Sequence, residues 1–369
     1  MHQQITKLYG SAYDLVRTSL VQRMDMRTLL SWRATNRRNY VDTCHELRTS
    51  LEYLLADFVP SPAALLTLLS RTRGVLAGEL AIRYILRDPS VLPQSLDIYL
   101  GSIWFDTFIE TFGDSHELYG FRTDWSLTTY IGDFIETRHV TDTVSIALSN
   151  GNSINIHAAA SPSACHALAC SPSTIGTTFV MEFTFATAYP RLTLSRRAII
   201  CWDLLATAAD SELDMYDRLA DSGLTFEEDP AVWFQPCGCP ASDVLPSPST
   251  SPSVCLRSLY LCPQQGRYFG DGGSMVCFMD SLSMDTALLK DRCIPPYGVM
   301  AVWRLPLDRP CDAGCREYDD ILAPGVIVTS LMLESESVMT GRYSCTSTVY
   351  GHDAAGSTGL RGRGRSVSF

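Results

Sequence analysis

Two short segments in the first third of the chain carry the residue types that a phosphate-handling site needs. An apolar run at 75–77 ends at Gly78, where a helical pattern containing Glu79 begins, and a second apolar run after a proline-bounded turn carries Asp97. A glycine turn lets backbone N–H groups approach a phosphate, and a carboxylate on the next strand can hold Mg²⁺, which prefers hard oxygen ligands. Gly78, Glu79 and Asp97 are therefore the candidate residues for metal-dependent nucleotidyl transfer.

A second set of candidate ligands consists of cysteines in the C-terminal half. Thiolate pairs on turns hold structural zinc, and the cysteines with this type of placement are Cys237, Cys239, Cys262, Cys311 and Cys315. The C-x-C spacing of the first pair is poor for a zinc knuckle, and a Pro/Ser-rich insertion follows it. We therefore favour buried or incidental thiols over a zinc site. The histidines are scattered and show no H-E-x-x-H pattern.

The elements that must position the glycine turn alternate between helix and strand over residues 59–235. Ser61 and Pro62 predict the start of an apolar helix that ends near Gly74. Strands are expected at 75–77 and 96–100, and helices through 82–86, at 103–112 and at 127–136. Asn150-Gly151, between two alternating runs, favours a type I′ hairpin.

The remainder of this region gives weaker patterns. Residues from 161 begin as a Ser/Pro/Cys loop, and an apolar helix is expected before Tyr189-Pro190, where the proline breaks the run. Residues 212–224 predict an amphipathic surface helix that stops at Gly223. A low-complexity Pro/Ser-rich loop covers 236–253, and a β-rich, Cys-containing part covers 254–350.

Four short β-like runs are expected in that part, at 254–261, 274–280, 298–305 and 325–333. Residues 351–369, which end in RGRGRSVSF, are expected to form a disordered basic tail.

Residues 11–58 predict helices, because leucines recur at helical spacing. The segment RMDMRTLLSWRATNRRNYVDTCHELR resembles the second half of an F-box, although the opening Leu-Pro-x-Glu is replaced by ITKLYGSAYDL. The resemblance implies docking to a Skp-type adaptor. We favour the alternative that this segment is a helical cap packed on the next domain.

Several runs together resemble a family of uncharacterised fungal proteins whose core looks like a nucleotidyltransferase domain of the polymerase-beta type. These runs are GELAIRYILRDPSVLPQSLDIYL, SINIHAAASPSACHALACSPSTIGTTFVMEF, AYPRLTLSRRAI and the CG…LCP region, and together they cover roughly residues 15–315. The resemblance implies an α/β or α+β fold. Its mixed sheet would be of nucleotidyltransferase type, with an N-terminal helical segment and an irregular Cys-rich β part.

The same resemblance implies an incomplete catalytic site. Glu79 stands where the family fold has Ser or Gly, and Ser95 stands at the first position of the expected Asp-x-Asp pair, which leaves Asp97 alone. The third carboxylate is expected on the strand after the hairpin, which offers Asn155 and His157 instead. Two-metal catalysis needs clustered carboxylates, so the resemblance implies a degenerate nucleotidyltransferase.

Composition narrows the partner classes. The 369 residues carry a net charge of −11, with 46% hydrophobic residues, which favours a folded protein and argues against a nucleic-acid partner. The first ten residues lack the apolar core of a secretory signal, and no apolar run is long enough for a membrane span. We expect an intracellular protein, cytoplasmic or nuclear, with reduced cysteines.

Three functions follow from these observations. The first is a non-catalytic scaffold or interaction protein, a pseudoenzyme without a cofactor. The second is an active Mg²⁺-dependent nucleotidyltransferase that binds a nucleoside triphosphate and uses Asp97. The third is an F-box-type adaptor for a ubiquitin ligase. Because the catalytic residues are incomplete, we expect a protein partner rather than an enzymatic substrate.

Overall fold

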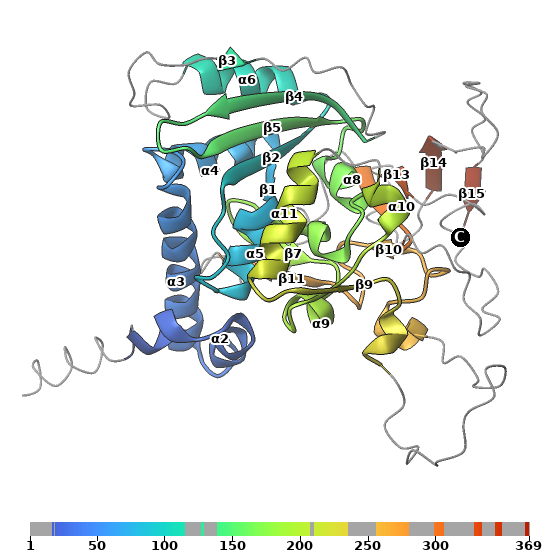
Figure 1. Cartoon of the computed structure of the whole chain (residues 1–369), viewed down its shortest axis with the longest axis horizontal. Helices are drawn as coiled ribbons and strands as arrows, with labels where there is room; N and C mark the ends of the chain where they lie inside the picture. Colours follow the sequence, from blue (N-terminus) through green and yellow to red (C-terminus); the bar gives the residue numbers. More distant parts are fainter. Residues whose placement is uncertain are drawn as a thin grey trace, which may run out of the picture.

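The computed structural model describes residues 17, 19–114, 127–128, 139–206, 210–234, 256–279, 299–305, 328–333, 344–348 and 366–368. Within these residues the chain is a mixed α/β protein with a main sheet of eight strands and a second sheet of five (Figure 1). The mixed α/β class predicted from the sequence is confirmed. No helix in the described part of the chain has the length and apolar character needed to cross a membrane.

The N-terminal helices pack into the same core as the main sheet. They are α2 (Met26–Arg33), α3 (Arg37–Leu55) and α4 (Pro62–Thr72). Met26, Leu29 and Leu51 are buried in one apolar cluster with Leu80 of the following helix and Ile98 of the sheet. The apolar faces of α2 and α3 are therefore covered within this chain, and the two helices form a cap on the sheet.

The main sheet has one parallel pair among antiparallel ones. Its strands are β1 (Val75–Ala77), β2 (Ser95–Gly101), β3 (Leu127–Thr128), β4 (Val140–Ala147), β5 (Ser153–Ala159), β6 (Thr178–Val180), β7 (Thr184–Thr187) and β11 (Met275–Phe278). Their order is β11-β7-β6-β1-β2-β5-β4-β3, and β2 and β5 are the parallel neighbours. Because β11 pairs with β7, the chain after the Pro/Ser-rich loop contributes a strand to the main sheet.

Helix α5 connects the two sides of the core. The helices after the cap are α5 (Gly78–Leu86), α6 (Phe105–Asp114), α8 (Ala164–Ala169), α9 (Pro190–Thr193), α10 (Trp202–Leu205) and α11 (Asp210–Asp221). Tyr84 of α5 belongs to the cluster beneath the cap, whereas Ile82 packs with Tyr216 and Leu219 of α11. Figure 1 shows α11 beside α5.

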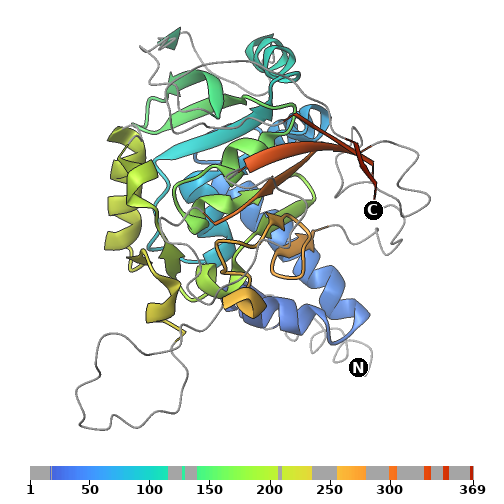
Figure 2. The same ribbon diagram turned by 90° about the vertical axis from the view of Figure 1, so that its right-hand side faces the viewer.

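The remaining described elements include the strands of the second sheet and a two-stranded parallel pair. They are the 3-10 turns η1 (Thr174–Thr177), η2 (Pro230–Val232) and η3 (Leu256–Leu259), the parallel pair β8 (Arg197–Ile199) and β9 (Thr225–Glu227), and the second-sheet strands β10 (Arg267–Tyr268), β12 (Val299–Trp303), β13 (Val328–Leu333), β14 (Ser344–Thr348) and β15 (Ser366–Ser368). Helix α8 contacts β12 and β13 of the second sheet and β2 and β5 of the main sheet. The second-sheet strands β12 and β13 are drawn in orange and red in Figure 2.

The apolar run before Pro190 is a β-hairpin, so the predicted helix is wrong. Its residues form β6 and β7, and the Met181 N–H closes the turn by donating to the Thr184 carbonyl at 2.7 Å. The Thr178 hydroxyl on β6 donates to the Thr187 hydroxyl on β7 at 3.1 Å. β-Branched and aromatic residues fit a buried strand better than a helix, and apolar length alone did not reveal this.

Two further local predictions require correction. The hairpin at Asn150-Gly151 is present, but Leu148 and Asn152 close a three-residue loop in which only Gly151 has a positive φ, so the turn is not type I′. Part of the expected Ser/Pro/Cys loop is helix α8.

Predictions elsewhere have mixed outcomes. Leu127-Thr128 is strand β3, where a helix was expected, and the run at 254–261 contains the 3-10 turn η3 instead of a strand. Residues 236–253 and 351–365 lie outside the described residues.

Candidate functional site

Gly78, Glu79 and Asp97 lie together where β1 ends and α5 begins. Ala77 pairs with Asp97 across β1 and β2, and Gly78 follows with a φ of +66°. A Cβ on Gly78 would lie 2.3 Å from Oδ2 of Asp97. Glycine is needed here because L side chains disfavour this φ and the carboxylate leaves no room for one.

Three polar side chains of β2 and β5 surround the Asp97 carboxylate. Residues two apart share a strand face, which groups Ser95 with Asp97 and Asn155 with His157, and the register places Asp97 opposite Asn155. Ser95 Oγ donates to Oδ2 of Asp97 at 2.8 Å, and Asn155 Nδ2 donates to Oδ1 at 2.8 Å. His157 Nε2 lies 3.8 Å from Oδ1.

Further contacts fix the side chains of Asn155 and His157, which lie beside Asp97. Ser145 Oγ on β4 donates to Asn155 Oδ1 at 2.9 Å, the Thr143 hydroxyl bonds to His157 Nδ1 at 3.0 Å, and Tyr99 stacks on His157 with ring centroids 4.6 Å apart. The side-chain orientations are therefore set by the sheet itself.

The electrostatic environment stabilises the ionised form of Asp97. Burial raises the pKa of this carboxyl, but the hydrogen bond and charge of His157 and the hydrogen bonds from Asn155 and Ser95 outweigh burial and hold the pKa below its ordinary value of 3.8. Asp97 is thus a buried carboxylate whose charge is balanced by neighbours on the same sheet.

Glu79 forms a separate buried contact with α11. Its Oε1 accepts from Arg218 Nε at 2.8 Å, and its Oε2 accepts from the backbone N–H of Gln94 at 3.1 Å. The Glu79 side chain is 2% exposed and that of Arg218 is 32% exposed. The hydrogen bond to Glu79 raises the pKa of Arg218. Glu79 therefore connects the start of α5 to α11 and to the segment that leads into β2.

Helix α11 contributes a second carboxylate to this region. Burial raises the pKa of Glu212, and the charge of Asp97 adds to this effect. The hydrogen bond from Tyr216 and the charge of His157 oppose it without cancelling it. The Tyr216 hydroxyl lies 3.5 Å from Glu212 Oε1 and 3.4 Å from Ser171 Oγ. The sequence predicted α11 as a surface helix, and only the fold shows that its inner face supplies Glu212, Tyr216 and Arg218 to the site.

Sequence reasoning could not have found the α11 residues near the site. The chain separates Glu79 from Arg218 by 139 residues, and neither residue lies in a motif that indicates the other. The position of Asn155 and His157 was signalled, because the strand after the Asn150-Gly151 hairpin is where a third ligand was expected.

The structure describes one of the five cysteine candidates. Cys262 is buried, while Cys237, Cys239, Cys311 and Cys315 lie outside the described residues.

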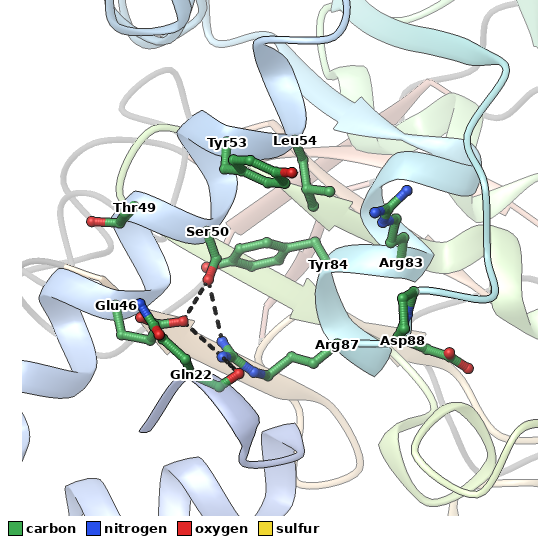
Figure 3. A pocket seen from close by; sticks show the side chains of 11 residues that line it. Gln22, Glu46, Thr49, Ser50, Tyr53, Leu54, Arg83, Tyr84, Arg87 and Asp88 are labelled. Carbon is green, nitrogen blue, oxygen red and sulfur yellow. Dashed lines mark hydrogen bonds and ion pairs between the residues drawn. The ribbon is translucent and has the colours of Figure 1, made fainter. Parts of the chain in front are cut away.

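A pocket lies on the other end of α5, between this helix and α3 of the cap (Figure 3). Its volume is about 380 Å³, within the range of small-molecule sites. Arg87 Nη2 contacts Glu46 Oε1 at 2.7 Å inside it. Tyr53, at 73% exposure, and Arg83 also line the pocket. The pocket does not include Glu79 or Asp97.

Comparisons with protein-family models, curated proteins and solved structures gave no match to this chain. Its function is therefore inferred from its own side chains and their geometry.

Proposed function

We propose that this chain is a non-catalytic scaffold or interaction protein built on a nucleotidyltransferase-like fold. One observation carries the proposal: both candidate carboxylates are engaged by neighbouring side chains of the chain itself. Asp97 accepts hydrogen bonds on both oxygens from Ser95 and Asn155. Glu79 accepts on both oxygens from Arg218 and the Gln94 backbone.

The chemistry of nucleotidyl transfer explains why this arrangement opposes catalysis. A triphosphate must approach the glycine turn, and two metal ions must be clamped by clustered carboxylates. Here Oδ2 of Asp97 occupies the space beside Gly78, so a negative charge stands where the phosphates would approach. Glu79 carries a second negative charge at the start of α5, and its partner Arg218 neutralises it inside the protein.

The likeness to a nucleotidyltransferase rests on the placement of the residues. A glycine with positive φ after β1, an acidic residue on the antiparallel neighbour β2 and polar residues on the parallel strand β5 follow the expected order. Such a site keeps its framework while its carboxylates become part of the core.

The pocket between α3 and α5 is a concave surface that the scaffold offers to a partner. Its lining includes the exposed aromatic ring of Tyr53 and the guanidinium of Arg83, and aromatic and arginine side chains are common anchors of protein interfaces. The adaptor alternative has weaker support, because Leu29 of the F-box-like segment is buried in an apolar cluster that includes residues of the main sheet.

Calorimetry with purified full-length protein tests the proposal. Titrations of Mg²⁺ with each of the four nucleoside triphosphates should give no binding heat. Metal-dependent binding that is lost in Asp97→Asn and kept in Asp142→Asn, an exposed position on β4, would overturn the proposal in favour of an active transferase.

A second experiment tests the partner surface. Cross-linked partners of the wild-type chain should be retained by Asp97→Asn and lost by the double variant Tyr53→Ala/Arg83→Ala. Retention by the double variant would show that the pocket is not the partner site.

A further inference from the structure

Three potential metal ligands from distant parts of the sequence lie together beside α8. His139 immediately precedes β4, and its carbonyl accepts from the Ala160 N–H at 2.9 Å, where β5 has just ended. His166 lies on α8 and Cys170 is the residue that ends it. The spacing of four residues places His166 and Cys170 on one face of the helix.

The donor atoms of these residues converge. One ligand atom from each of His139, His166 and Cys170 lies within 4.8 Å of the other two. The two imidazole ring centroids are 6.0 Å apart with an interplanar angle of 60°. Among the described residues, no other group of three or more His, Cys, Asp or Glu side chains has donor atoms that converge in this way. Glu79 and Asp97 do not belong to the group.

We propose that His139, His166 and Cys170 bind a zinc-class divalent metal ion. Zn²⁺ bonds of about 2.0–2.1 Å to nitrogen and 2.3 Å to sulfur give tetrahedral donor separations of about 3.4–3.6 Å. The widest pair must therefore approach by little more than about 1 Å, which small side-chain rotations provide. Imidazole with thiolate is the donor set that suits Zn²⁺ rather than Mg²⁺.

Charge and solvation shape the binding step. His166 is 3% exposed, and its burial lowers the pKa to about 4, so the imidazole is in its neutral, ligating form. Burial raises the pKa of the Cys170 thiol, so metal binding must release the thiol proton to solvent as the metal–thiolate bond forms. Three protein donors leave one tetrahedral position for water or another ligand.

An ion bound at this position would connect two parts of the fold. α8 packs against β2 of the main sheet and against β12 and β13 of the second sheet. A metal held by His139 and by His166 and Cys170 connects the start of β4 to this helix. Binding should therefore raise the temperature of thermal unfolding. This inference is independent of the proposed function, because it uses none of the residues around Asp97.

Cobalt substitution tests the proposal on the full-length protein. After removal of metals with a chelator, Co²⁺ titration should reach one ion per chain, with the visible absorption of tetrahedral Co²⁺ and a thiolate-to-cobalt charge-transfer band. Zn²⁺ should displace the Co²⁺. Cys170→Ser should remove the charge-transfer band. His139→Gln should weaken binding by at least about 100-fold, since even indirect ligand contacts contribute about 10–100-fold.

Matched variants separate this site from other thiols and histidines. Cys165→Ser on the same helix and His45→Gln on the exposed face of α3 should bind Co²⁺ as the wild type does. Far-ultraviolet circular dichroism of each metal-free variant verifies folding. A charge-transfer band that persists in Cys170→Ser and disappears in Cys237→Ser/Cys239→Ser would overturn the proposal, as would the absence of stoichiometric binding to folded wild-type protein.

Discussion

Replacement of Asp97 by asparagine tests whether this carboxylate is structural. The variant keeps the size of the side chain and removes its charge. If the amide oxygen faces Asn155 Nδ2, the amide nitrogen faces the Ser95 hydroxyl, which must then accept instead of donating. The opposite orientation sets two NH₂ groups against each other. In either orientation, both hydrogen bonds of 2.8 Å lose their charged acceptor.

The size of the loss follows from the two bonds. Hydrogen bonds to charged groups contribute about 1.5–3 kcal/mol and neutral ones about 0.5–1.5 kcal/mol, so two exchanges lose about 2–3 kcal/mol. Removal of a buried charge offsets part of this loss. We expect the free energy of unfolding in urea, followed by circular dichroism at pH 7 without metal, to fall by about 1–2 kcal/mol.

The opposite sign would refute this reasoning. Catalytic carboxylates that await metal ions repel one another, so their neutralisation stabilises the protein. An unchanged or higher unfolding free energy in Asp97→Asn would therefore contradict a structural role. Asp142→Asn, at an exposed position of the same sheet, is the control and should change stability by less than about 0.5 kcal/mol.

The same pair of proteins should differ in pH dependence. The pKa of folded Asp97 is below its ordinary value of 3.8, so its stabilisation is complete above that value and is lost as the pH falls through the folded pKa. The stability difference between wild type and Asp97→Asn should be constant at neutral pH and shrink in acid. Urea unfolding between pH 7 and pH 3 measures this difference.

Three further substitutions test the surrounding contacts. Arg218→Gln leaves Glu79 buried without its cation and should lower the unfolding free energy by about 3 kcal/mol. The double variant Glu79→Gln/Arg218→Gln should regain part of this lost free energy. Glu212→Gln should raise the thermal midpoint at pH 7 but not below pH 4.5, because a carboxyl with raised pKa loses its stabilising contribution as pH rises through that pKa. Gly78→Ala should cost about 2–4 kcal/mol in urea unfolding, from its positive φ and the contact with Asp97.

Local patterns in the sequence predicted the framework of the site. Apolar runs, turn residues and helix periodicity located β1, α5 and β2, because each signal acts within about ten residues. The hairpin before β5 was predicted for the same reason. The β6–β7 hairpin was not, because its burial depends on partner strands outside the local pattern. The loop type at Gly151 was also missed, although Leu148 and Asn152, which close the loop, are local.

The tertiary structure alone decided which side chains meet. The parallel register of β2 and β5 directs Asn155 to Asp97, and the packing of α11 against α5 brings Arg218 to Glu79. His139 reaches His166 and Cys170 because the start of β4 lies beside the end of β5, from which the chain leads into α8. Such contacts depend on strand register and helix packing across long separations, and residue type and spacing do not encode them locally.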